Sequence, residues 1–254
     1  MKARKRFGQH FLTDDYCLQS MATAIAPKTD DHLVEIGPGQ GALTEYLTDQ
    51  SKQLDLIELD RDLIPLLEKK FQNKVTIHQC DVLEFDLHQL YHDQKLRVVG
   101  NLPYNISTPL LFHLFSQLEL IEDMHFLLQK EVVDRLVAKP GSKNYARLSV
   151  MSQFYCQATA IIEVPPTAFD PPPKVESTFV RLAPHKEPHK VNSHEQLEAI
   201  VREAFSYRRK TLSNSLKRWI SADQLAALNI DPKRRPQELT VEEYIRISDA
   251  LPVQ

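Results

Sequence analysis

The chain has 254 residues, of which 31 are Lys or Arg and 34 are Asp or Glu, so its formal net charge is −3. A hydrophobic share of 42% is enough for a sizeable core and excludes a disordered chain, a collagen and a coiled coil. Read alone, the near-neutral charge predicts no particular affinity for nucleic acid.

The sequence also indicates where the protein works. No apolar run approaches the roughly 18 residues that cross a bilayer, and the basic start is not followed by the apolar segment of a secretory signal. The three cysteines are scattered, which argues against a disulfide framework. We therefore expect a cytoplasmic protein with no membrane attachment.

Short apolar runs alternate with helical patterns from about residue 30 to residue 180. Strands are predicted over residues 32–36, 54–59, 74–77, 96–100 and 124–128, with helices such as 42–48 and 61–71 between them. This alternation predicts an α/β fold with a mostly parallel sheet. Residues 151–164 and 177–182 have continuous β-type patterns and predict an antiparallel edge on the same sheet.

The composition changes after the last predicted strand. Residues 183–190 contain two prolines and no apolar periodicity, which indicates a linker. Beyond it the apolar spacing is helical, at Leu197, Ile200, Val201, Ala204 and Phe205. Ser221 with Gln224, and Thr240 with Glu243, have the spacing of capping boxes. The predicted domains are residues 1–185 and a small C-terminal all-helical domain, residues 186–254.

A glycine-rich loop follows the first predicted strand of the sheet. Gly37, Gly39 and Gly41 permit a tight turn and let a ligand approach the backbone. The pattern also suits a dinucleotide such as NAD, and an ordinary surface turn is a further alternative. An acid inside the loop, Glu35, is unfavourable for a pyrophosphate but suits a ligand with a cationic amino group.

Two further acids follow the next two predicted strands. Glu58 ends the second strand, where a carboxylate can bind both hydroxyls of a ribose, and Asp81 follows the third. Three acids at these places around a glycine loop are typical of methyltransferases that use S-adenosylmethionine. The sequence therefore predicts that cofactor and a Rossmann-like methyltransferase sheet.

A second motif follows the fourth predicted strand, where open α/β sheets bind ligands. The side-chain oxygen of Asn101 and the backbone carbonyl of Leu102 provide two acceptors for the N–H groups of an exocyclic aromatic amine. Pro103 stiffens the turn, and Tyr104 offers a face for base stacking. The motif predicts methylation of a nucleobase amine by positioning. A plain Asn-Pro turn is the alternative.

The sequence resembles the ribosomal RNA adenine N6-dimethyltransferase family, and most of all its bacterial KsgA branch, from about residue 5 to about residue 245. The motifs that carry the resemblance are FGQHFL (7–12), EIGPGQG (35–41), GNLPYNIST (100–108), FDPPPKVES (169–177) and FSYRRKTL (205–212).

The resemblance implies dimethylation of two adjacent adenosines in the 3′-terminal hairpin loop of 16S rRNA, within the immature small ribosomal subunit. It implies cofactor contacts at His10, Leu12, Glu35, Gly37, Gly39, Glu58, Asp81 and Asn101. The family often has Asn where this chain has His10. The resemblance also implies that Phe169 stacks the flipped-out base opposite Tyr104; a core position at a strand end is the alternative.

Basic residues concentrate in three places despite the negative total charge. Residues 1–10 hold four cations and no acid, residues 202–218 hold six cations and one acid, and residues 233–235 are all basic. Because phosphate binding needs several cations together, these clusters predict local, salt-dependent RNA binding. The predicted RNA-binding residues are Arg4, Lys5, Arg6, Arg208, Arg209, Lys210, Lys217, Arg234 and Arg235.

Two other functions remain open at this stage. One is a related 23S rRNA adenine N6-methyltransferase, and the other is a non-catalytic ribosome assembly factor. The segments around Arg208 and Arg235 favour the small-subunit enzyme. The spacing of His185, His189 and His194 suits no usual zinc pattern, so no metal is expected. We expect a monomer.

Overall fold

The computed structural model describes residues 10–252 of the chain. By its contacts the chain divides into two compact units, one of residues 1–133 and 159–184, the other of residues 134–158 and 185–254. The second unit thus includes residues 134–158, which lie within the first domain of the sequence-based division. None of the helices in the described range is long and apolar enough to span a membrane.

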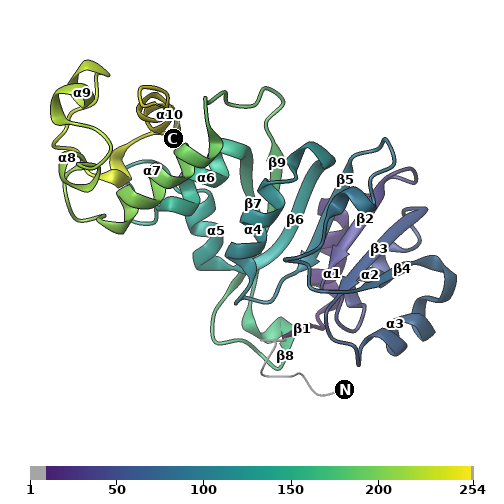
Figure 1. The fold of residues 1–254 in the computed structure, drawn as a ribbon. Helices are drawn as coiled ribbons and strands as arrows, with labels where there is room; N and C mark the ends of the chain where they lie inside the picture. The colour runs from purple at the N-terminus through teal and green to yellow at the C-terminus, as the bar shows by residue number, and fades with distance from the viewer. Residues whose placement is uncertain (1–9, 253–254) are drawn as a thin grey trace. The chain divides into compact units, whose positions relative to one another are not determined.

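The first unit is built on a twisted sheet (Figure 1). The seven strands lie in the order β4-β3-β2-β5-β6-β9-β7. They are β2 (His32–Ile36), β3 (Gln53–Glu58), β4 (Thr76–Gln79), β5 (Leu96–Asn101), β6 (Ile121–Gln129), β7 (Cys156–Val164) and β9 (Ser177–Pro184). From β4 to β6 all neighbours pair in parallel, and β9 pairs antiparallel with β6. The predicted α/β fold with an antiparallel edge is confirmed.

Two short strands form a separate sheet beside the main one. β1 (Phe11–Leu12) pairs antiparallel with β8 (Phe169–Asp170), and Leu12 lies opposite Phe169. Asp14 begins the following helix, because its carboxylate accepts a hydrogen bond from the Cys17 amide at 2.8 Å. The pairing holds the N-terminal segment against a part of the chain about 160 residues later.

The helices of the first unit are α1 (Asp15–Ile25), α2 (Ala42–Leu47), α3 (Ile64–Phe71), α4 (Ser107–Phe115) and the beginning of α5 (Lys130–Leu136). Apolar side chains of α1, α2 and α3 pack with those of β2 and β3 in one core cluster, which includes Met21, Leu47, Leu56 and Phe71. This packing leaves the carboxyl ends of the parallel strands and the loops after them to form the site.

The second unit is helical. It contains α6 (Arg147–Tyr155), α7 (His194–Ser206), α8 (Leu212–Ser215), α9 (Ala222–Ala227) and α10 (Val241–Asp249). Both predicted capping boxes are confirmed: Ser221 and Gln224 exchange bonds at the start of α9, and Thr240 and Glu243 do so at α10.

One predicted element is wrong in its first part. Residues 151–155 belong to α6, and the strand begins only at Cys156. Most of α6 is buried, from Leu148 to Phe154, and its two serines are buried too. Periodicity alone does not separate a short helix buried on all sides from a buried strand, because both have continuous apolar patterns.

Candidate active site

A cavity of about 380 Å³ opens at the carboxyl ends of β2, β3, β4 and β5. Because these strands are parallel, the loops that follow them meet at one edge of the sheet. The lining residues include nearly all the residues predicted to bind cofactor or substrate: His10, Leu12, Glu35, Gly37, Gly39, Glu58, Asp81, Asn101, Leu102 and Tyr104. The sheet thus brings together groups from four separate strand ends.

The glycine loop between β2 and α2 forms one wall. Gly37, Gly39 and Gly41 all have positive φ, at 65°, 59° and 76°, which side chains disfavour. At Gly39 there is a second constraint, since a Cβ atom there would lie 3.1 Å from the Phe11 ring. The loop therefore needs glycine both for its turns and for the close passage of Phe11 from the N-terminal segment.

Glu35 is a buried acid at the floor of the cavity, with 1% of its surface exposed. Its carboxylate accepts a hydrogen bond from the Thr44 hydroxyl at 2.7 Å. Burial raises the pKa of Glu35 to about 7, and the neighbouring Glu58 carboxylate adds to the rise. A cationic ligand group entering the cavity would favour the ionised form of Glu35.

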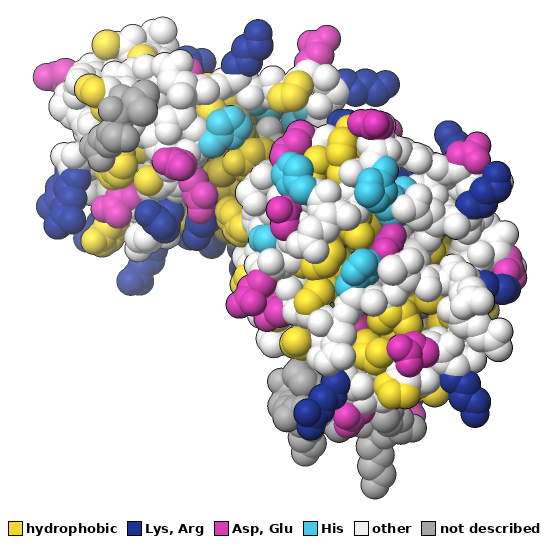
Figure 2. Space-filling model, turned by 45° about the vertical axis from the view of Figure 1, so that its right-hand side comes forward, with side chains coloured by type: hydrophobic (Ala, Val, Ile, Leu, Met, Phe, Trp, Pro, Cys, Tyr) yellow, Lys and Arg dark blue, Asp and Glu magenta, His cyan; other side chains and the backbone are white. Residues whose placement is uncertain are grey.

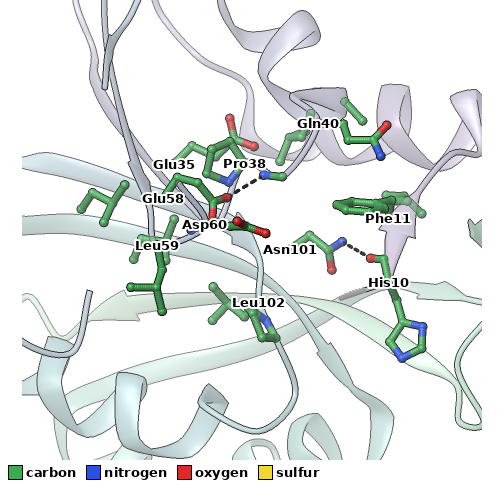
Figure 3. A pocket seen from close by; sticks show the side chains of 18 of the residues that line it. His10, Phe11, Glu35, Pro38, Gln40, Glu58, Leu59, Asp60, Asn101 and Leu102 are labelled. Atoms are coloured by element: carbon green, nitrogen blue, oxygen red, sulfur yellow. Dashed lines mark hydrogen bonds between the residues drawn. The ribbon is translucent and has the colours of Figure 1, made fainter. Parts of the chain in front are cut away.

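Glu58 is held in a fixed orientation by backbone donors. One oxygen accepts from the Asp60 amide at 2.8 Å, and the other accepts from the Gly39 amide at 3.1 Å (Figure 3). Burial raises the pKa of Glu58, although these amide donors work against the rise. On the next strand end, Asp81 accepts from the Leu83 amide at 2.9 Å. Both acids line the cavity.

The Asn101 side chain is oriented by the N-terminal segment. Its amide nitrogen donates to the carbonyl oxygen of His10 at 3.2 Å, and its amide oxygen points away from His10 (Figure 3). Because the donor end is bound, the acceptor end is the one presented for another partner. The Leu102 side chain is buried, and its backbone amide donates to the Leu127 carbonyl at 3.3 Å.

Tyr104 is half-buried and contacts Ser177 and His10. Its hydroxyl is 2.7 Å from the Ser177 hydroxyl, and its ring stacks with His10 at a centroid distance of 5.7 Å. His10 in turn donates from Nδ1 to the Pro171 carbonyl at 2.7 Å. His10 thus contributes a carbonyl to Asn101 and a ring to Tyr104.

Phe169 lies opposite Leu12 in the β1–β8 pair, but its side chain is in the core. It is 4% exposed, belongs to the same core cluster as Leu12, and is not among the residues that line the cavity. The structure therefore places Phe169 in the core position that was the alternative interpretation. Stacking of a base on Phe169 stays a prediction.

Sequence reasoning missed two side chains that support the site. Lys70 of α3 donates to the Gln40 carbonyl at 3.0 Å and forms an ion pair with Glu45 at 2.6 Å. Nothing in the sequence links Lys70 to a loop 30 residues earlier. Thr44, the partner of Glu35, was detectable in principle, since it lies in the first turn of the helix that the glycine loop begins.

The predicted RNA-binding residues fall into three groups. Arg4, Lys5 and Arg6 lie outside the described residues. Arg209, Lys210, Lys217 and Arg235 are exposed, and Arg208 is partly exposed. Arg234 is different, because its guanidinium forms an ion pair with Glu243 at 2.5 Å. Hydrogen bonds to the Glu243 carboxylate raise the pKa of Arg234. Arg234 therefore ties a loop to α10 rather than presenting a free charge.

No cluster of three or more His, Cys, Asp or Glu side chains suited to a metal ion occurs within residues 10–252. All three cysteines are free thiols.

Comparison with known proteins identifies the family. The model of the family described as ribosomal RNA adenine dimethylase matches residues 1–252. The chain belongs to this family. The resemblance drawn from its motifs is confirmed.

Curated relatives match the chain along its whole length. Ribosomal RNA small subunit methyltransferase A of Coxiella burnetii (strain CbuG_Q212) is 56% identical over 254 residues, covering 99% of this chain and 98% of the relative. The protein of the same name from Marinomonas sp. (strain MWYL1) is 52% identical, covering 98% and 95%. Both of these relatives are small-subunit enzymes by name.

Solved structures agree on the fold. A dimethyladenosine transferase from Plasmodium falciparum has a TM-score of 0.82 at 26% identity, covering 94% of this chain and 96% of its own. The 23S rRNA methyltransferase ErmE has a TM-score of 0.73 at 24% identity, covering 95% and 99%. The Rossmann-like methyltransferase fold is confirmed.

Proposed function

We propose that the protein transfers methyl groups from S-adenosylmethionine to the N6 amines of two adjacent adenosines in the 3′-terminal hairpin loop of 16S rRNA. The observation that carries this proposal is the Asn101 amide, held by the His10 carbonyl with its oxygen directed away, in a cavity that also holds buried acids. The family and the names of the relatives support the small subunit as substrate.

The cavity fits the proposed cofactor. Its volume lies within the usual range for small-molecule sites. The buried Glu35 carboxylate suits the amino group, the fixed Glu58 carboxylate suits the ribose hydroxyls, and Asp81 suits the adenine amine. His10, Leu12, Gly37 and Gly39 complete the lining. When bound, the cofactor supplies an electrophilic methyl group on a sulfonium.

The protein's own part is to hold the target amine. The Asn101 oxygen and the Leu102 carbonyl accept its two N–H groups, which directs the nitrogen lone pair towards the methyl group. Tyr104 contributes a ring for stacking, which is worth about 1–3 kcal/mol per base. The amine becomes strongly acidic only as it gains the methyl group, so no strong general base is needed. Positioning accounts for most of the rate enhancement.

The substrate is a particle rather than a small molecule. We propose that the protein acts as a monomer on the immature small subunit in the cytoplasm, with a role in small-subunit biogenesis. The target adenosine flips out of its stack to reach the cavity. The first unit, residues 1–133 and 159–184, provides the catalytic groups, and the helical unit provides RNA contacts.

Incubation with radiolabelled S-adenosylmethionine and unmethylated ribosomal subunits tests the proposal. Labelled dimethyladenosine in the 3′-terminal loop of small-subunit RNA is the expected result. Label confined to large-subunit RNA would assign the protein to the 23S enzymes instead. If the protein binds small subunits but transfers no labelled methyl group to their RNA, the result would favour a non-catalytic assembly factor.

A further inference from the structure

Three segments that are far apart in the sequence form one surface of the helical unit. We define this basic surface as loop 139–144, turn 207–211 and turn 231–235. The Leu212 amide donates to the Arg234 carbonyl at 2.7 Å, and the Ser213 amide donates to the Pro232 carbonyl at 3.1 Å. Arg208 donates to the Lys143 carbonyl at 2.6 Å. The Arg208 bond joins turn 207–211 to loop 139–144, and the two amide bonds join turn 231–235 to the start of α8, directly after turn 207–211.

The basic surface carries cations that the structure leaves uncompensated. Lys139, Lys143, Arg209, Lys210, Lys233 and Arg235 are exposed, and within residues 10–252 none of them is ion-paired to a carboxylate. Asp231 is the acid within the surface, and its carboxylate accepts from the Lys233 backbone amide. Lys and Arg side chains gather along the lower edge of this unit in the space-filling view (Figure 2). Loop 139–144 thus adds two cations to those that the sequence clusters contain.

Tyr207 is an exposed aromatic ring on a fixed backbone within this surface. It ends α7 and is 52% exposed. Its amide donates to the Ala204 carbonyl at 3.3 Å, and its carbonyl accepts from the Lys210 amide at 2.8 Å. Phe205, two residues earlier, instead packs inward between Tyr145 and Tyr244. Packing within the helical unit therefore does not explain why a large ring stands at position 207.

We infer that the basic surface holds a single-stranded stretch of the substrate RNA, with phosphates on its cations and one unpaired base stacked on Tyr207. This inference rests on the proposed function and adds contacts made by residues that do not line the cavity. Phosphates need several cations in one place, and an aromatic face binds any base without hydrogen-bond readout. A cationic surface around one exposed ring provides both.

Binding of unmethylated small subunits, measured over a series of KCl concentrations, tests the inference. Tyr207→Ala should raise the Kd about tenfold with an unchanged salt slope, because stacking releases no counterions. Tyr207→Phe should retain the wild-type Kd. Lys143→Ala should weaken binding and lower the salt slope by roughly 0.7–0.9, as expected for one phosphate contact.

Matched controls use residues outside the basic surface. Tyr16 is 78% exposed in the first unit, and Lys186 is an exposed lysine of the helical unit. Tyr16→Ala and Lys186→Ala should leave the Kd and the salt slope unchanged. Equal effects of Tyr16→Ala and Tyr207→Ala, or an equal loss in Tyr207→Phe, would overturn the stacking role.

Two further readouts separate the possible failures. A photoreactive benzoylphenylalanine in place of Tyr207 should cross-link to RNA, and cross-links only to ribosomal protein would overturn the inference. Methyl transfer by the wild-type protein is measured on the same subunits. Methylation with an unaffected Tyr207→Ala Kd overturns this inference alone, whereas absence of methylation by the wild type overturns the proposed function and the inference with it.

Discussion

At the scale of single residues, the ionisation of Glu35 makes the stability of the folded protein depend on pH. Its folded-state pKa of about 7 lies above the ordinary value for Glu, because burial disfavours the charged form. The folded protein therefore loses stability as the pH rises from the ordinary Glu pKa to about 7, since only the unfolded chain ionises freely in that window. Thr44, Glu58 and Lys70 are the groups that modulate this carboxyl.

The same ionisation should control cofactor binding. If the amino group binds the carboxylate, the affinity for S-adenosylhomocysteine should increase about eightfold from pH 6 to pH 7.5, where the ligand amine stays protonated. Isothermal titration calorimetry at both pH values measures this. Glu35→Gln should bind more weakly and equally at both. A wild-type affinity that does not change with pH would show that Glu35 does not bind the amino group.

Residue types at the site were largely predictable, because they follow strand ends within short, spaced motifs. Their orientation was not. That the Asn101 nitrogen binds the His10 carbonyl depends on a strand pair, β1 with β8, between segments about 160 residues apart. Likewise, nothing local in the sequence showed that Phe169 faces the core or that Arg234 is ion-paired.

At the scale of elements, the glycine loop tolerates little change at Gly41. A Cβ at Gly41 would lie 2.5 Å from the Phe71 ring, and φ is positive there as well. Gly141 has a similarly positive φ but nothing within 4 Å of the added atom. The two glycines therefore separate backbone strain from steric overlap.

Substitution by alanine should reflect that difference. Gly141→Ala should lower the free energy of unfolding by about 1–2 kcal/mol through left-handed strain alone. Gly41→Ala should cost about 1–3 kcal/mol more, because Phe71 must move. Urea unfolding followed by circular dichroism measures both. Equal costs would mean that Phe71 yields without loss, contrary to the packing described.

The order of the helices and strands was easier to predict than the residues at which each begins and ends. Strand and helix alternation predicted the parallel sheet, since periodicity and turn residues are local signals. The division between units was harder, because α6 belongs with the helical unit although it precedes β7 and β9 of the sheet. Contacts between distant segments decide that grouping.

At the scale of the whole molecule, the net charge of −3 conceals a strong segregation of charge. Folding increases this segregation of charge, because turn 231–235 is hydrogen-bonded to the start of α8, next to turn 207–211. The sequence showed that basic clusters existed but not that two of them meet. RNA affinity should accordingly be local to the helical unit and sensitive to salt.

A triple substitution tests this. Arg208→Ala, Arg209→Ala and Lys210→Ala together should weaken small-subunit binding by at least tenfold at moderate salt and lower the salt slope by about two to three. Filter binding measures the Kd, and calorimetry with S-adenosylhomocysteine should show wild-type cofactor affinity. An unchanged subunit Kd would contradict the assignment of this surface to RNA.

Arg234→Ala provides the contrasting variant. Since Arg234 is ion-paired with Glu243, its removal should lower the thermal stability of the protein while leaving the salt slope of RNA binding near the wild-type value. Melting by differential scanning fluorimetry and the same filter-binding series distinguish the two effects. A salt slope lowered as much as in Lys143→Ala would instead place Arg234 on a phosphate.

In the proposed mechanism, the Asn101 amide, oriented by the His10 carbonyl, positions the target amine for methyl transfer. The direct measurement is single-turnover methylation of unmethylated small subunits by Asn101→Ala, with subunit and cofactor affinities determined in parallel. Asn101→Ala should transfer the methyl group at least about 100-fold more slowly than the wild type, with a near wild-type subunit Kd. Methyl transfer at the wild-type rate would contradict it.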